Sequence, residues 1–259
     1  MIIRRRKFIK KALSSTVSVT LAASFPSFML SSCSRKPDLN QRTIKKLIVN
    51  EILHEGDFNL ELADQLLEDN AEIQLINTIN WTEYPYKPEV KFKIAYCQDQ
   101  ILLKYYVKEE NILARETKTN GDVHKDSCVE FFISTKKDAP YYNFEFNCIG
   151  ILKLGYGKGR ADRVMTDPEI LKQIKVRSSL GNQPFEEKTG GHQWEMMISI
   201  PKDCLTYDKN IVLKGLQANA NFYKCGDDTS KPHFVTWNPV KTENPDYHQS
   251  AFFGEISFE

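Results

Sequence analysis

The sequence lacks the residue patterns that mark most metal centres and hydrolase active sites. Its six cysteines include no Cys-x-x-Cys pair, and its five histidines are dispersed as His54, His124, His192, His233 and His248. Neither a Gly-x-Ser-x-Gly elbow nor a His-Glu-x-x-His motif occurs. Because zinc clusters and common hydrolases need such arrangements of ligands or nucleophiles, these absences argue against both.

Long apolar runs are also missing after residue 30, so no later stretch is expected to span a membrane. The first 33 residues have the composition of a signal peptide. A basic segment ending at Lys11 precedes a Ser/Thr-diluted apolar stretch from Ala12 to Leu30, and Ser31-Ser32-Cys33 supplies small residues for processing. We therefore predict that residues 1–33 direct export and are not part of the folded domain.

Two short motifs refine this prediction. Arg5-Arg6-Lys7-Phe8-Ile9-Lys10 resembles a twin-arginine export motif, and Leu30-Ser31-Ser32-Cys33 resembles a lipobox. The second resemblance implies that Cys33 is acylated, which would anchor an exported lipoprotein on a membrane, periplasmic or at the cell surface. An ordinary cleaved signal peptide is the alternative. Residues 34–43 would then form a polar tether.

Without residues 1–33 the chain carries 29 basic and 34 acidic residues, since that segment holds six basic residues and no acidic ones. A mildly acidic domain without a basic stripe is a poor candidate for nucleic-acid binding. The five cysteines after Cys33 are odd in number and irregularly spaced: Cys97, Cys128, Cys148, Cys204 and Cys225. We expect most to be buried thiols on strands, although a Cys128–Cys148 bridge would be feasible if their strands pair.

Residues 44–259 show the periodicity of one all-β domain. Val90, Phe92, Ile94 and Tyr96 alternate with more polar residues, and Trp194 begins a similar run. Strand-like runs recur at 45–53, 73–80, 90–97, 100–107, 127–134, 142–149, 150–156, 193–200, 211–224, 233–238 and 252–258. Helical signals are confined to 60–68 and to a short helix opened by Asp167-Pro168-Glu169. The pattern predicts an antiparallel β-sandwich, jelly-roll or immunoglobulin-like, with a few short helices.

Two neighbouring runs, 126–133 and 142–148, are the most informative part of the chain. In the second, Asn143, Glu145 and Asn147 share one face of the strand and Phe144 shares the other with Phe146. A row of amides and a carboxylate is either a solvated sheet surface or a surface that binds a polyhydroxylated ligand. Glu130 and Glu145 could also form the carboxylate pair of a glycosidase if their strands are adjacent.

Aromatic residues that could stack on sugar rings accompany this polar row. They are Trp81, Tyr84, Tyr86, Tyr141, Tyr142, Tyr156, Tyr223 and Trp237. Trp237-Asn238-Pro239 is the preferred platform, because the tryptophan ends a strand and the proline should turn the chain outward. Trp194 belongs to an apolar strand face and is assigned to the core, whereas Trp81 fits either the core or the site.

The order of several motifs resembles the carbohydrate-binding module family 9-like proteins over most of residues 45–259. The motifs are Asn80-Trp81, Tyr84-Pro85-Tyr86-Lys87-Pro88, Lys125–Phe132, Tyr141–Asn147, Asn221–Asp228, Trp237-Asn238-Pro239 and Phe253–Ile256. The resemblance implies a β-sandwich related to the DOMON superfamily and non-catalytic binding of saccharides between two tryptophans. It also implies roles for individual residues: Glu130 would accept hydrogen bonds from sugar hydroxyls, Asn143 and Glu145 would contribute from the next strand, and Trp237 would be the second tryptophan.

His124 stands where the resemblance places the first tryptophan, which implies weaker binding or a different ligand. The predicted carbohydrate-binding residues are Trp237, His124, Glu130, Asn143, Glu145, Asn147, Arg160 and Asn238. No cofactor is expected, although the resemblance allows a structural calcium held by Asp227-Asp228 or Asp122.

The leading hypothesis is a lipid-anchored module that binds oligo- or polysaccharide and supports its breakdown, alongside partner glycoside hydrolases or transporters. The alternatives are a protein that itself hydrolyses O-glycosyl bonds, a haem protein like some DOMON relatives, and a structural or partner-binding sandwich that has lost sugar binding.

Overall fold

The computed structural model describes residues 44–57, 59–137 and 140–259. The predicted signal peptide, with Cys33, and the tether at 34–43 lie outside these described residues. Within the described part of the chain, every helix is too short or too polar to cross a membrane. The structure below concerns the unit formed by residues 43–259.

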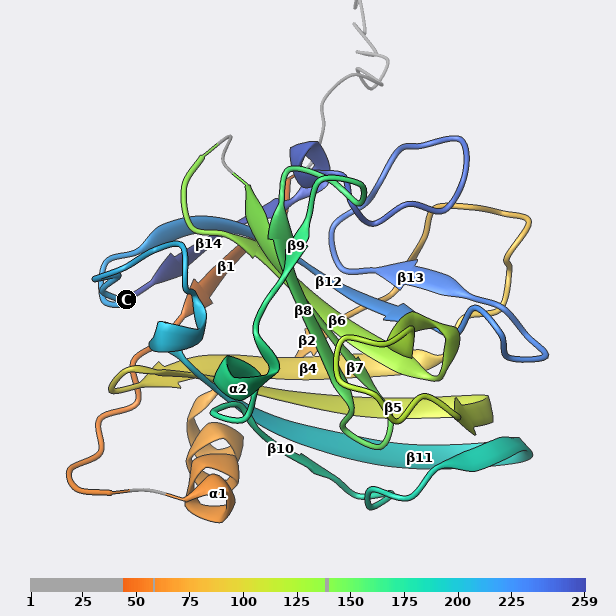
Figure 1. The fold of residues 1–259 in the computed structure, drawn as a ribbon, viewed down its shortest axis with the longest axis horizontal. Helices are drawn as coiled ribbons and strands as arrows, with labels where there is room; N and C mark the ends of the chain where they lie inside the picture. The colour runs from red at the N-terminus through yellow and green to blue at the C-terminus, as the bar shows by residue number, and fades with distance from the viewer. Residues whose placement is uncertain (1–43, 58, 138–139) are drawn as a thin grey trace, which may run out of the picture. The chain divides into compact units, whose positions relative to one another are not determined.

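Two β-sheets pack face to face (Figure 1). The larger sheet contains, in spatial order, β1 (Lys46–Val49), β14 (Gly254–Phe258), β12 (Gln217–Cys225), β6 (Cys128–Ser134), β7 (Tyr141–Asn147), β8 (Leu152–Gly157) and β9 (Val164–Met165). Two further strands lie outside this order: β13 (Phe234–Thr236) pairs with β12, and β3 (Thr78–Ile79) pairs with β13. The smaller sheet contains β10 (Lys175–Ser178), β11 (Phe185–Pro201), β5 (Gln100–Ala114), β4 (Glu89–Cys97) and β2 (Gln74–Leu75). These strands pair antiparallel except β1 with β14. The predicted antiparallel sandwich is confirmed.

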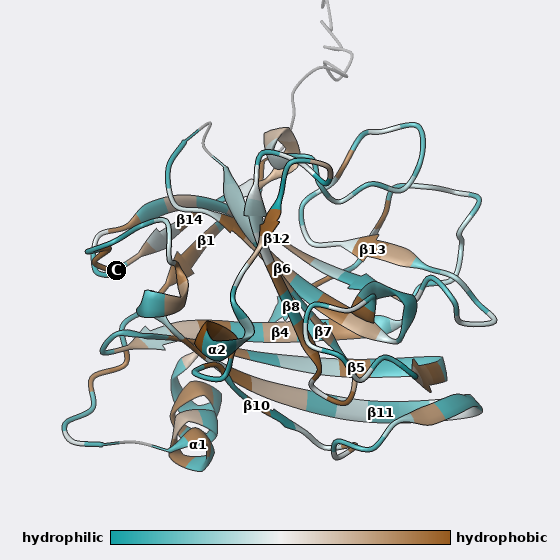
Figure 2. Ribbon diagram, in the orientation of Figure 1, coloured by the Kyte–Doolittle hydropathy of each residue, from teal (hydrophilic) through white to brown (hydrophobic). Residues whose placement is uncertain are grey.

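The core lies between the sheets and follows the predicted alternation. Val90, Phe92 and Ile94 on β4 are buried there, and Trp194 on β11 is buried as expected. Phe92 stacks on Phe222 of β12 with ring centroids 3.9 Å apart, so aromatic packing joins the two sheets. Figure 2 shows hydrophobic and hydrophilic residues alternating along the strands, as expected where only one face meets the core.

Two short α-helices begin where the sequence indicates. In α1 (Leu60–Asn70) the Asn59 side chain accepts a hydrogen bond from the backbone N–H of Leu62. In α2 (Pro168–Leu171) Asp167 caps the first turn, as predicted. Ala63 and Leu67 of α1 are buried in a small cluster with side chains of β4 and β5, so this helix covers the outer face of the smaller sheet (Figure 1).

The outer face of the larger sheet is covered as well, and this cover creates the candidate site. A second hydrophobic cluster forms there from Trp81, Val123, Cys128, Phe132, Tyr141, Tyr223, Cys225, Val240, Tyr247 and Phe253. The segments around Trp81 and Tyr247 pack over β6, β7 and β12. Trp81 is therefore a core residue of this cluster, and the Asn143/Glu145/Asn147 row is not a wet sheet surface.

All five cysteines in the described residues are buried free thiols, as expected for most of them. Cys97, Cys128 and Cys225 lie on strands. The Cys128–Cys148 bridge does not form. In the β6–β7 pair Cys128 faces Asn147, and the Cys148 thiol turns instead toward the backbone oxygen of Leu113 at 3.5 Å.

Candidate carbohydrate-binding site

Glu130 and Glu145 face each other directly across the β6–β7 pair. Side chains alternate between the two faces of a strand, so both carboxyl groups point to the outer side of the larger sheet, while Phe131 and Phe144 point into the core. Both glutamates are almost completely buried beneath the covering segments. The expected adjacency of the two strands is thus confirmed.

A pocket with a cavity of about 240 Å³ opens above these two glutamates. Side chains from segments that are distant in sequence meet in it. The lining residues are Tyr84, His124, Glu130, Glu145, Arg160, Arg163, Cys225, Asp227, Phe234, Pro245, Asp246, Tyr247 and His248. Charged and polar groups dominate the interior, and aromatic side chains complete the wall.

Glu145 is the centre of the polar contacts in this pocket. Arg163 donates to its Oε1 at 2.9 Å, and the amide of Asn143 donates to the same oxygen at 2.7 Å. His124 Nδ1 lies 3.8 Å from Oε2. Arg163 is only 14% exposed, so this ion pair is fixed within the protein, where opposite charges interact more strongly than on a surface.

His248 extends the network behind Arg163. Its Nε2 is 3.3 Å from the guanidinium and its Nδ1 is 2.9 Å from the Tyr141 hydroxyl. Burial, followed by the positive charges of Arg163 and Arg160, lowers the pKa of His248 to about 3, so its imidazole is neutral. Arginine can only donate, so Nε2 accepts from Arg163 and the Nδ1–H donates to the tyrosine oxygen.

Two acids in the pocket hold protons more strongly than usual. Burial and the charge of Glu145 raise the pKa of Glu130 well above its ordinary value. Burial also raises the pKa of Asp227 to about 6, against the opposing effect of Arg160. Burial lowers the pKa of His124, with Glu145 acting against the shift. Glu130 and Asp227 therefore keep their protons to higher pH than ordinary carboxyl groups do, beside the fixed Arg163–Glu145 pair.

Four of the predicted binding residues meet in this pocket: His124, Glu130, Glu145 and Arg160. Arg160 stands at the opening, with its side chain 59% exposed and 3.3 Å from Asp246 Oδ1. Asn143 lies behind Glu145 and does not line the cavity, and its Oδ1 is buried without a hydrogen-bond partner.

The prediction that Trp237 is the stacking platform is wrong. Its side chain is 1% exposed and packs edge-on against Phe92 and Phe222 between the sheets. Gly254 allows this position, because a Cβ there would lie 2.3 Å from the indole ring. Trp237 follows the same alternation as Val235, which is also in the core, and this is why the ring points inward.

The prediction that Asn147 and Asn238 bind carbohydrate is also wrong. Both side chains form hydrogen bonds that hold separate segments of the backbone together. Asn147 donates to Asp126 and to the backbone oxygen of Glu116, each at 2.9 Å, and accepts from a nearby N–H. Asn238 donates to the Phe252 carbonyl at 2.8 Å and accepts from the Lys45 N–H at 2.9 Å. Both side chains are buried and hydrogen-bonded within the fold, and neither lines the pocket.

Sequence reasoning missed Arg163, Asp227, Asp246 and His248 as pocket residues, together with the aromatic side chains of Phe234 and Tyr247, whereas Tyr84 was among its aromatic candidates. Arg163 lies three residues after Arg160, in a segment that begins with Gly155, Gly157 and Gly159, and this run of glycines was the available signal. Asp246 and His248 belong to a polar segment without periodicity, and nothing in its sequence indicates that it folds over the sheet.

The suggested calcium ligands are engaged in other ways. Asp122 pairs with Lys125 at 2.9 Å, and Asp227 lines the pocket. A structural calcium remains a prediction.

Comparison with known proteins agrees with this geometry. The family model for carbohydrate-binding family 9 matches residues 61–258. The crystal structure of a protein from Bacteroides uniformis, described as a candidate carbohydrate-binding protein, is 41% identical, with a TM-score of 0.80, 84% of this chain covered and 100% of the other. Among curated proteins, none matches the sequence.

Two structures of a family 9 carbohydrate-binding module from Caldicellulosiruptor kristjanssonii share the fold at 13% identity. The cellotriose complex has a TM-score of 0.50 and covers 83% of this chain and 94% of the module, and the glucose complex has a TM-score of 0.51 with coverages of 83% and 96%. The family match extends over most of the described sandwich, including both strands that carry the glutamate pair. The chain belongs to carbohydrate-binding family 9.

Proposed function

We propose that this chain binds a carbohydrate without cleaving it, in the pocket above Glu130 and Glu145. The observation that carries the proposal is the fixed arrangement of Glu145, Arg163 and His124 around one cavity. A carboxylate that accepts and a guanidinium that donates, both already oriented, can hydrogen-bond neighbouring sugar hydroxyls at little entropic cost.

The dimensions and walls of the pocket suit a single sugar unit. Its cavity of about 240 Å³ is smaller than the ~300 Å³ at which sites for drug-sized ligands begin. Tyr84 and Phe234 lie on its wall with ring centroids 4.8 Å apart, half-buried, and offer apolar surface to the C–H face of a sugar. We infer that the end of an oligosaccharide enters while the rest stays outside.

Family membership and the glucose and cellotriose complexes of the Caldicellulosiruptor module indicate which ligands to test first. Isothermal titration with glucose, cello-oligosaccharides and xylo-oligosaccharides should give binding heat for at least one series. In that series Glu145→Gln and Arg163→Met should each weaken affinity by about tenfold or more. Glu186→Gln is the matched control, because Glu186 is exposed, pairs with Arg115 and does not line the pocket.

Two results would contradict this proposal. If folded parent protein gives no heat with any oligosaccharide, or if Glu145→Gln binds as tightly as the parent, the pocket is not a carbohydrate site. The chain would then be a structural or partner-binding sandwich.

Hydrolysis of O-glycosyl bonds is the second candidate, and one observation favours it. Glu130 has a raised pKa and lies in register with Glu145, as an acid and its partner carboxylate do in glycosidases. An aryl-glycoside panel tests this, with Glu130→Gln as the variant that should abolish turnover. Release of the aryl group by the parent, lost in the variant, would replace the non-catalytic proposal.

We also propose that the chain is exported by residues 1–33 and anchored to a membrane through acylated Cys33, periplasmic or at the cell surface. The basic segment, the twin-arginine-like motif and the lipobox-like motif support this. A module held there could present sugar chains to glycoside hydrolases or transporters during carbohydrate breakdown. Radiolabelled palmitate should be incorporated into the parent and not into Cys33→Ala, which should also leave the membrane fraction. Equal labelling of both would contradict the anchor.

A further inference from the structure

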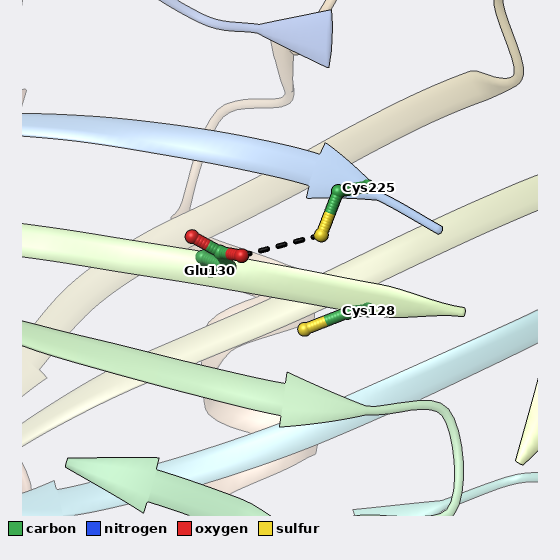
Figure 3. Close-up of side chains that lie close together, drawn as sticks. All are labelled: Cys128, Glu130 and Cys225. Atoms are coloured by element: carbon green, nitrogen blue, oxygen red, sulfur yellow. Dashed lines mark hydrogen bonds between the residues drawn. The ribbon is translucent and has the colours of Figure 1, made fainter. Parts of the chain in front are cut away.

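Two cysteines and a glutamate meet where β6 and β12 pair, at the inner end of the pocket. Cys128 lies directly opposite Cys225 in the antiparallel register, and Glu130 is two residues further along β6 on the same face. Figure 3 shows the two sulfurs and the carboxyl group turned toward one another from these neighbouring strands. The three side chains are all buried.

The distances between these groups suit a small metal ion. One ligand atom from each residue lies within 4.8 Å of the other two, and Cys225 Sγ is 3.2 Å from Glu130 Oε1. Tetrahedral zinc, with bonds of about 2.0 Å to oxygen and 2.3 Å to sulfur, places its ligand atoms about 3.5 Å apart. Side-chain rotations alone would therefore complete the coordination. Across the described residues, this is the one group of three such side chains that comes so close together.

We propose that Cys128, Cys225 and Glu130 form a binding site for a soft divalent cation, Zn²⁺. Two sulfur ligands select zinc over calcium or magnesium, which prefer oxygen. On binding, the two thiol protons, and the carboxyl proton where Glu130 holds one, are released to solvent, and the two thiolates with the carboxylate coordinate the ion.

The pocket supplies both the route to this site and its fourth ligand. Glu130 and Cys225 line the cavity, so an ion can reach them from solvent, whereas Cys128 closes the site from the sheet side. Three protein ligands with one position open to water is the pattern of accessible zinc sites. The backbone oxygen of His124, 3.5 Å from Cys225 Sγ, holds that thiol in place.

The sequence argued against zinc because its cysteines have no close spacing. That reasoning applies to sites built from one loop, whereas here the ligands come from strands far apart in the chain. Only the register of β6 with β12 brings Cys128 opposite Cys225.

The experiment is a titration of the reduced, chelator-treated full-length chain with Co²⁺, which reports cysteine ligands through its near-ultraviolet thiolate charge-transfer absorption. We expect a saturable band at one equivalent that Zn²⁺ removes. Cys128→Ser and Cys225→Ser should each abolish the band, and Glu130→Gln should weaken binding by about tenfold or more. Cys204→Ser is the matched control, because Cys204 is also a buried free thiol and lies in the 3-10 helix Lys202–Cys204.

Circular dichroism of each metal-free variant confirms that loss of the band is not loss of the fold. The proposal is overturned if no saturable band appears, if it survives in Cys128→Ser, or if the chain purified from its native compartment carries a Cys128–Cys225 disulfide. Sugar titrations of the metal-free protein keep the two proposals separate, because the sugar contacts proposed for Glu145 and Arg163 involve none of the three metal ligands.

Discussion

Asp227 is a pocket residue whose charge changes close to neutral pH. Its pKa is raised to about 6 from an ordinary 3.8, chiefly by burial. The folded protein therefore binds this proton more tightly than the unfolded chain does. The stability contributed by protonated Asp227 is complete below about pH 4 and is lost as pH rises through 6.

Asp227→Asn should remove this pH dependence. Above pH 6 the variant should be more stable than the parent, by at most about 3 kcal/mol at about 1.4 kcal/mol per pKa unit, and the gain should vanish below pH 4. Urea unfolding from pH 4 to 8 measures the difference. A gain that is constant over this range would show that Asp227 does not titrate near 6.

Trp237 gives the second prediction for a single residue. Because its ring is enclosed between the sheets, Trp237→Ala should lower the free energy of unfolding by about 3–5 kcal/mol. Trp237→Phe keeps much of the packing, so it should remain folded and bind sugar within about twofold of the parent. Chemical denaturation and calorimetric titration check both variants. If Trp237→Phe folded but did not bind sugar, Trp237 would be a binding residue, contrary to this account.

Sequence alone located Glu130 and Glu145 because strand alternation fixes which face a side chain occupies. It misplaced Trp237 because the following proline was given more weight than the alternation shared with Val235. The roles of Asn147 and Asn238 could not be assigned from the sequence. Whether such an amide bonds to a ligand or to the backbone depends on loops, and loops have no periodicity to read.

At the scale of elements, the β8–β9 turn positions Arg163 through a glycine. A Cβ on Gly155 of β8 would lie 2.7 Å from Asn143 Oδ1 and 3.1 Å from Arg163 Cδ. Gly155→Ala should therefore displace Arg163 from Glu145 and weaken sugar binding by about tenfold, or 1.4 kcal/mol. Gly159→Ala, in the same turn with nothing within 4 Å of the added Cβ, should bind like the parent. If both variants bound sugar with equal affinity, Gly155 would not be needed to position Arg163 for binding.

Element boundaries were predictable where one face of a strand is apolar. The second half of β11, which begins near Trp194, was found, whereas its first half from Phe185 is mostly exposed and carries no alternation. The two-residue strand β9 was missed for the same reason, and with it the placement of Arg163. Tertiary pairing, not local propensity, forms these segments.

At the scale of the whole molecule, a buried ion pair joins the two sheets. Lys224 of β12 lies 2.8 Å from Glu109 of β5, both side chains fully buried, and Trp194 donates to the other carboxylate oxygen at 2.7 Å. Removing one partner leaves a buried charge without compensation, so Lys224→Met should cost about 3–5 kcal/mol of unfolding free energy. Denaturant titration measures this loss. Adding Glu109→Gln to that variant should restore part of it, and no recovery in the double variant would contradict the pairing.

The sandwich as a whole could be predicted from its many short alternating strands. The cover over the outer face of the larger sheet could not, because the segment that carries Asp246 and His248 is polar and irregular. Its position depends on long-range contacts such as the Tyr223–Tyr247 ring stack, with centroids 4.1 Å apart. The pocket exists only because of this cover, and so the part of its lining that the cover supplies could not be predicted from the sequence.

The most direct test of carbohydrate binding in this pocket is a crystal structure of the chain with the oligosaccharide that calorimetry selects. The account predicts the terminal sugar ring inside the cavity, with hydroxyl groups within 3.2 Å of Glu145 and Arg163 oxygen and nitrogen atoms, about the limit of a hydrogen bond. A sugar bound elsewhere on the sandwich, with this pocket filled only by water, would contradict it.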